Sequence, residues 1–162
     1  MRPAIFAAYL FLALSAAGCG RDYSYYYLMG LNEYELGRYS VAKECFRVAA
    51  EKNPESDAES WRTYMAGIEL YGLGRYAEAL EALKETSEKH PEWASREWLE
   101  KTHRALGQEE YKLGRLSEAR RHFEAAMELD PSSPAAEWLK KIDKGINPET
   151  PPSRGGDEEP AP

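Results

Sequence analysis

A short phrase that begins Leu-Gly-Arg occurs three times in this chain, over residues 36–42, 73–79 and 113–119. Its glycines are separated by 37 and 40 residues. This spacing fits two-helix units of about 34 residues with small insertions between them, so it predicts a helical solenoid. A catalytic loop would not be expected three times in a chain of 162 residues, so the repetition favours a binding role over a catalytic one.

Other residues recur at fixed distances from each phrase. The glycine of the phrase would adopt a left-handed conformation and end the first helix. An earlier glycine and a later alanine, which lies opposite it, would let the two helices cross closely. A proline would then end the second helix. We expect the leucine of the phrase to pack the last turn of the first helix. The recurring sets are Gly30, Gly67 and Gly107; Ala42, Ala79 and Ala119; Phe46, Leu83 and Phe123; and Pro54, Pro91 and Pro131.

With these residues in register, the chain resembles the tetratricopeptide repeat family. The resemblance covers repeats at about residues 23–54, 60–91 and 100–131, with departures at Thr86, where the family has alanine, and at His103, where it has an aromatic residue. It implies an all-α fold, a right-handed α-solenoid of three helix pairs. We expect the first helix of the third repeat to start near Glu92, about two turns longer than is usual in the family. The resemblance says almost nothing about the partner.

The segment after the last repeat has the pattern of a capping helix over residues 134–145. Ser133 suits the N-cap, Pro134 the first helical position and Gly145 the C-terminal stop. Apolar residues of this helix would cover the open end of the solenoid, which gives a repeat domain over residues 23–145. The last 17 residues, 146–162, are rich in proline and acidic side chains without an apolar period, and we expect them to be disordered.

Residues 1–18 have the layout of a secretory signal peptide. The apolar stretch 4–17 is too short for a comfortable membrane span, and small residues lead up to Cys19. The segment 15–19 resembles the cleavage box of bacterial lipoproteins, in which the thiol of the cysteine carries diacylglycerol. Ala16 departs from the leucine that is commonest there. Lipidation of Cys19 is the preferred interpretation, with ordinary cleavage or a retained anchor as alternatives.

A lipid on Cys19 would hold the repeats close to a bilayer. Residues 19–22 form the anchor and its tether, which spans at most about 10 Å before the first helix. By resemblance to Gram-negative lipoproteins, Gly20 after the cysteine implies delivery to the outer membrane, facing the periplasm. The tyrosines at 23 and 25–27 would then lie at the depth of the headgroups. The alternative, preferred for Tyr26, is that these rings pack the first repeat.

Charge and motifs argue against nucleic-acid binding and catalysis. The net charge is −7, and −8 once Arg2 leaves with the signal peptide, without a cluster of basic residues. No His-Glu-x-x-His or paired-cysteine motif is present, so we expect no metal, cofactor or enzymatic site. Cys45 is the one cysteine besides Cys19, and we expect a small buried hydrophobic residue rather than a reactive thiol.

The family register places a concave groove along the first helix of each repeat. In the first two repeats its lining is aromatic and aliphatic, and in the third it is basic and amide-bearing, which would suit a peptide with an apolar segment followed by acidic residues. Packing between repeats and the acidic tail of the chain are alternative uses of the same surface. The candidate groove residues are Tyr27, Leu31, Trp61, Tyr64, Ile68, Arg104 and Gln108.

The sequence thus favours a membrane-anchored periplasmic scaffold or adaptor. It would bind envelope proteins or peptides in its groove, and by resemblance to small lipoproteins of this family it would serve envelope assembly, secretion or pilus machinery. The alternative is a structural envelope protein that associates with itself through the ends of its repeats and has no peptide ligand.

Overall fold

The computed structural model describes residues 22–91, 93 and 95–146, and within them it contains seven helices and no strand. The predicted signal peptide, Cys19 and most of the predicted tail lie outside the described residues. The chain divides into two compact units, which we call unit 1 (Met1–Glu92) and unit 2 (Trp93–Pro162). Each is described by itself.

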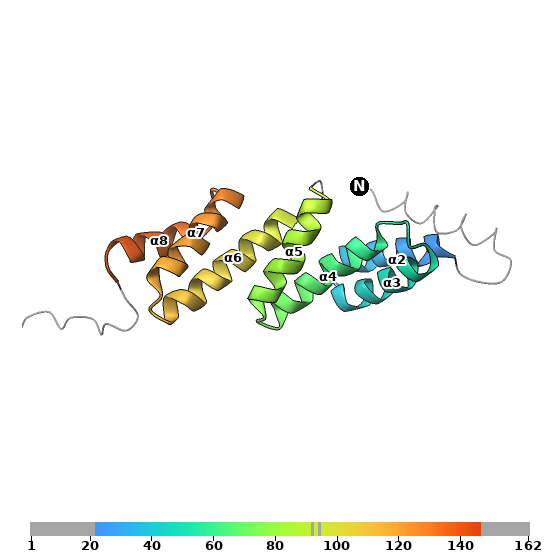
Figure 1. Ribbon diagram of the computed structural model, residues 1–162, viewed down its shortest axis with the longest axis horizontal. Coiled ribbons are helices and arrows are strands. Elements are labelled where there is room, and N and C mark those ends of the chain that lie inside the picture. The colour runs from blue at the N-terminus through green and yellow to red at the C-terminus, as the bar shows by residue number, and fades with distance from the viewer. Residues whose placement is uncertain (1–21, 92, 94, 147–162) are drawn as a thin grey trace, which may run out of the picture. The chain divides into compact units, whose positions relative to one another are not determined.

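Unit 1 contains two helix pairs. The first pair is α2 (Tyr23–Glu35) and α3 (Tyr39–Lys52), and the second is α4 (Ala58–Gly72) and α5 (Tyr76–Lys89). Each helix packs against the next one along the chain (Figure 1). Because only three residues join the helices of a pair, the two must run antiparallel.

Unit 2 contains a third pair and one further helix: α6 (Ser95–Lys112), α7 (Leu116–Leu129) and α8 (Ala135–Asp143). Helix α7 packs against both of its neighbours. The expected start of α6 near residue 92 is wrong, since the helix begins at Ser95. With 18 residues against 15 in α4, it is longer by about one turn rather than two.

The repeated phrase forms the same turn in all three pairs. Its glycines have φ of 71°, 75° and 72°, the left-handed region in which glycine is favoured. In the first copy the Arg38 N–H donates to the Glu33 carbonyl and the Gly37 N–H to the Tyr34 carbonyl, both at 2.9 Å. These two bonds are the Schellman motif, which satisfies carbonyl groups at the end of a helix.

The leucine of the phrase does not pack as expected. Leu36, Leu73 and Leu113 are 57%, 67% and 57% exposed. Leu36 and Leu73 are the C-cap residues of α2 and α4, and Leu113 follows the last residue of α6. All three therefore lie beyond the last turn that packs against the second helix, and the leucine side chain does not pack the turn.

The earlier glycine of each repeat lies where the two helices of a pair touch. A Cβ on Gly30 would lie 2.8 Å from ring carbons of Phe46, and one on Gly107 would lie 2.7 Å from the ring of Phe123. Atoms this close overlap, so no larger residue fits without a shift of the ring. The atoms nearest these glycines thus belong to the large residue of the second helix rather than to the alanine expected opposite. The alanines Ala42, Ala79 and Ala119 are nevertheless fully buried.

Helix α8 covers the end of the third pair. Its Trp138 stacks on Phe123, with ring centroids 5.7 Å apart and an interplanar angle of 12°, and meets Tyr111 edge-on at 5.2 Å. The helix begins at Ala135, one residue later than predicted, and the Ser133 hydroxyl accepts the Ala135 N–H at 3.1 Å. Helix α8 therefore lies within the segment where the sequence predicts a cap.

Candidate interaction surface

A cluster of aromatic rings joins the two helix pairs of unit 1. The indole of Trp61 on α4 stacks on Phe46 of α3 at 5.3 Å and 14°, and it lies 5.4 Å from the ring of Tyr34 on α2. Tyr34 in turn lies 6.0 Å from Tyr64. Such contacts contribute about 0.5–1.5 kcal/mol each beyond the area they bury. Much of the aromatic content of the first two repeats therefore serves packing between them.

Tyr27 is fixed by two hydrogen bonds at the edge of this cluster. Its hydroxyl donates to Oδ2 of Asp57 at 2.9 Å and accepts the indole N–H of Trp61 at 3.0 Å. Burial, and then the hydrogen bond to the Asp57 carboxylate, raise the pKa of Tyr27 well above its usual range. Tyr27 and Trp61 are half-buried, so each presents part of a ring whose position is set in advance.

Two of the predicted groove residues are not on a surface. Tyr64 is fully buried and Ile68 is 3% exposed, so both belong to the core. Their counterparts 37 residues earlier, Tyr27 and Leu31, remain half-buried. The difference arises because α4 packs against a preceding helix pair, which buries residues of the second repeat that α2 leaves open. In unit 1 the surface therefore reduces to Tyr27, Leu31 and Trp61.

In unit 2 the two predicted residues lie half-buried on α6, and one of them has a structural partner. Arg104 donates through Nε to Oε1 of Glu100 at 2.9 Å, and the same oxygen accepts the hydroxyl of Ser133 at 2.5 Å. Glu100 is only 7% exposed, so this pairing compensates a buried charge. Arg104 thus helps to hold the start of α8 through Glu100.

The arginines of the phrase form local ion pairs. Arg38 pairs with Glu33 at 3.3 Å and Arg115 with Glu110 at 3.2 Å, each across the Schellman turn, and Arg75 pairs with Glu78 at 2.5 Å. Glu33 is buried, whereas both partners of the Arg75 pair are exposed, and exposed pairs contribute about 0.2–1 kcal/mol. The recurring arginine therefore reinforces the turn.

One exposed apolar face lies outside the residues that the sequence predicts for binding. Leu28 and Met29 of α2 are 39% and 36% exposed, and Leu36 lies on the same side of the helix two turns later. The available signal was a run of ten residues, 23–32, without a single charged side chain in a chain that is 30% charged. The tyrosines of this run predict a location near the headgroups, and the helical spacing of its aliphatic residues is the signal that indicates the exposed face.

The structure also brings together two histidines of unit 2 that no local sequence pattern relates. Nδ1 of His103 on α6 and Nδ1 of His122 on α7 are 3.1 Å apart, a distance that requires one ring to donate and the other to accept. Across the described ranges 22–91, 93 and 95–146, no three His, Cys, Asp or Glu side chains are grouped as metal ligands. The pair therefore joins α6 to α7 by one hydrogen bond.

Cys45 is buried on α3, as expected. It is 7% exposed, and burial first, then the carboxylates of Glu33 and Glu44, raise the pKa of its thiol. A thiol with a raised pKa and little access is a poor nucleophile. Cys45 therefore serves packing.

Antiparallel helix pairs with the same turn, a close glycine at the same place and a large apolar residue against it define an α-helical repeat protein. Three family models, each described as tetratricopeptide repeat, match residues 24–56, 64–99 and 100–133. The chain belongs to the tetratricopeptide repeat family, with an all-α fold of the solenoid type, and repeats of this kind are generally non-catalytic scaffolds for protein–protein interaction. No curated protein matches the chain. None of the helices among the described residues is long and apolar enough to cross a membrane.

Proposed function

We propose that this protein is a lipid-anchored scaffold of the bacterial envelope that binds a segment of another protein through its repeats. The family supports the binding role, and residues 15–19, which resemble a lipoprotein cleavage box, support an anchor at Cys19. The proposed location is the periplasmic face of the outer membrane, where the partner would belong to assembly, secretion or pilus machinery.

The half-buried surface of Tyr27, Leu31 and Trp61 carries the binding proposal. Tyr27 and Trp61 are already fixed by their mutual hydrogen bond and the one to Asp57, so a ligand would order few side chains on binding. Aromatic residues with a polar group at one edge are common anchors of interfaces. Because Arg104 is engaged by Glu100, an acidic ligand segment gains less than the sequence suggested, and an apolar segment is the better fit.

Site-specific photo-crosslinking in intact cells tests this surface. A photoreactive amino acid at Leu31 should give a discrete crosslinked product with an envelope protein. The matched control is the same amino acid at Glu81, which is exposed on the second helix of the other pair in unit 1. Equal products from both positions, or none from Leu31, would contradict the proposed surface. Tyr64→Ala, by contrast, would remove a fully buried ring and report on folding instead.

Fractionation of cells that carry Cys19→Ala tests the anchor separately. The wild-type protein should sediment with membranes and the variant should not, because the repeats would have lost their attachment. A variant that sediments with membranes to the same extent as the wild-type protein would contradict the proposed lipid anchor.

A further inference from the structure

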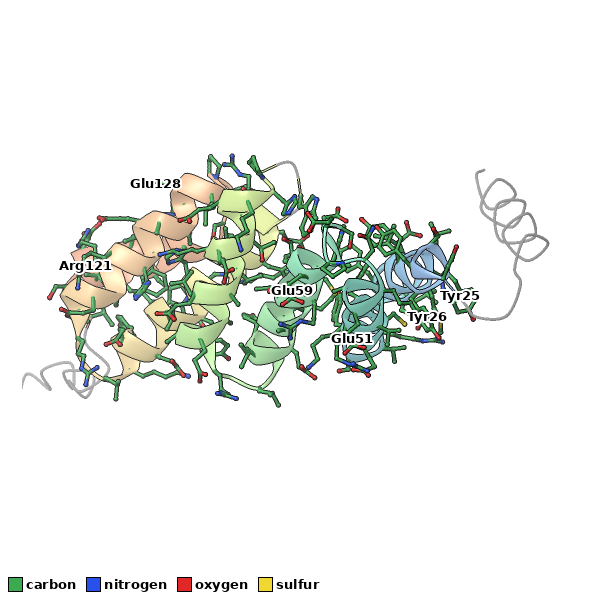
Figure 2. All side chains as sticks on the ribbon, turned by 45° about the vertical axis from the view of Figure 1, so that its right-hand side comes forward. Tyr25, Tyr26, Glu51, Glu59, Arg121 and Glu128 are labelled. Carbon is green, nitrogen blue, oxygen red and sulfur yellow. The ribbon has the colours of Figure 1, made fainter. Side chains whose placement is uncertain are left out.

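The side of α2 that faces away from the rest of unit 1 has no charged residue over residues 23–32, and the exposed Glu35 lies at its C-terminal end. Gly30 of α2 touches Phe46, and Tyr34 touches Trp61 and Tyr64, so these residues define the inner side of the helix. Helical spacing places a different set on the opposite side. We call it the α2 outer face, and it consists of Tyr25, Leu28, Met29, Asn32 and Leu36. Figure 2 shows Tyr25 projecting at the N-terminal end of α2, away from α4.

In the next repeat the corresponding residue is covered. Met65 of α4 lies 37 residues after Leu28 and is fully buried, whereas Leu28 is 39% exposed. Helix α4 packs on the preceding pair, and among the described residues no helix pair precedes α2. The α2 outer face is therefore an open end of the repeat stack.

The last helix among the described residues is built differently. Helix α8 presents Glu137, Lys140 and Lys141 to solvent, the polar outer side that end repeats of solenoids need for solubility. Helix α2 has no charged residue between 23 and 32. A lack of charge at an exposed end favours a partner that is itself poorly hydrated.

The sequence that precedes α2 indicates that a lipid bilayer would lie next to this helix. Only three residues separate Cys19 from Tyr23, so a lipid on Cys19 would hold the start of α2 within about 10 Å of the bilayer. Tyrosine is enriched where a membrane meets water. Lys52 lies 5.4 Å over the ring of Tyr26 at the same end of α2, where its ammonium would meet lipid phosphates.

We propose that the α2 outer face lies in the headgroup region of the bilayer, so that the membrane takes the place of the missing preceding repeat. The inference rests on the lipid anchor of the proposed function. It adds an orientation, because α2 lies along the membrane surface and the second pair of unit 1 faces away from it.

Fluorescence quenching in vesicles tests this orientation. The full-length chain, matured by its host and carrying Cys45→Ala, receives one new cysteine for an environment-sensitive label, either Leu28→Cys or the matched control Leu73→Cys. Leu73 is 67% exposed and lies in the same unit on the second pair. The proteins are reconstituted in phosphatidylethanolamine and phosphatidylglycerol vesicles that contain doxyl-labelled lipid. Asn32→Cys provides a second reporter on the α2 outer face.

We expect strong quenching at positions 28 and 32 and little at 73. If the intact mass shows the lipid on Cys19 but none of the labels is quenched, the orientation is wrong and the anchor stands. If the intact mass shows no lipid, the anchor fails and the orientation fails with it. If lipid does not quench position 28 and the protein crosslinks to itself there, a second copy covers the face, which also overturns the proposal.

Discussion

Two kinds of glycine carry the repeats at the scale of single residues. Those in the phrase end a helix with positive φ, and those earlier in each repeat let a large side chain approach the backbone. Gly72 belongs to neither kind, since a Cβ there meets no atom within 4 Å and its φ is not positive. Gly30 is therefore expected to be needed for close packing, and Gly72 is a matched control at which a methyl group meets no other atom.

Gly30→Ala should lower the free energy of unfolding by about 1–3 kcal/mol, because the added methyl overlaps the ring of Phe46. Gly72→Ala should be neutral or stabilise by up to about 1 kcal/mol, because alanine favours a helix over the unfolded chain. Urea denaturation of both variants measures the difference. Equal effects would show that the close contact at Gly30 does not constrain the fold.

Residue types recurring at fixed spacing made the turns predictable, but their burial was not. Tyr27 and Tyr64 occupy the same place in successive repeats, yet only Tyr64 is fully buried. Whether such a ring is exposed depends on the presence of a preceding repeat. The prediction for the leucine of the phrase was wrong for a similar reason. The repeat pattern places this leucine at the turn but does not determine the direction of its side chain.

Single polar side chains join one element to the next. Glu100 of α6 binds the hydroxyl of Ser133, which caps α8, and Glu69 of α4 accepts hydrogen bonds from Ser40 and Lys43 of α3. Glu100 and Ser133 are 33 residues apart, and no local pattern relates them. The sequence predicted Ser133 as a cap but could not predict its partner, and the contact between His103 and His122 was unpredictable for the same reason.

Ser133→Ala should destabilise α8 by about 1–3 kcal/mol, because the helix loses its cap and a buried carboxylate loses a donor. Hydrogen exchange of the α8 amides should speed up more than that of α7. Ser132→Ala is the matched control, since its hydroxyl bonds only the exposed side chain of Asp130. Similar exchange in both variants would rule out a special role for Ser133.

Glu69→Gln should lower the stability of unit 1 by about 0.2–1 kcal/mol at neutral pH, because its pair with Lys43 is half-exposed. The bond to Lys43 lowers the pKa of Glu69, with a smaller contribution from Ser40. A lowered pKa stabilises the fold above the ordinary pKa of glutamate, and this contribution is lost as the pH falls through the lowered value.

Melting temperatures measured from pH 7 down to pH 3 would therefore converge for the wild type and Glu69→Gln at the acid end. Glu81→Gln, a substitution at an exposed residue of α5, is the control at pH 7 and should change the melting temperature little there. A gap between the wild type and Glu69→Gln that persists unchanged in acid would mean that the carboxylate charge is not the source of the stability.

At the scale of the whole molecule, the chain combines a binding module with a proposed anchor. The family establishes the module, and the sequence alone sufficed to recognise it because its period, turns and prolines recur in register. The binding surface in the structure is smaller than the sequence predicts, because Tyr64 and Ile68 lie in the core and Arg104 supports α8. What remains is a half-buried aromatic and aliphatic surface on unit 1, together with an apolar face on α2.

The central claim is that a lipid on Cys19 anchors the repeats to a membrane. The intact mass of the protein extracted from membranes tests this claim most directly, because the proposed location of the repeats depends on the anchor. The account predicts a mature chain that begins at Cys19 and carries diacylglycerol on its thiol. A chain that begins at Met1, or at any residue other than Cys19 and without lipid, would contradict it.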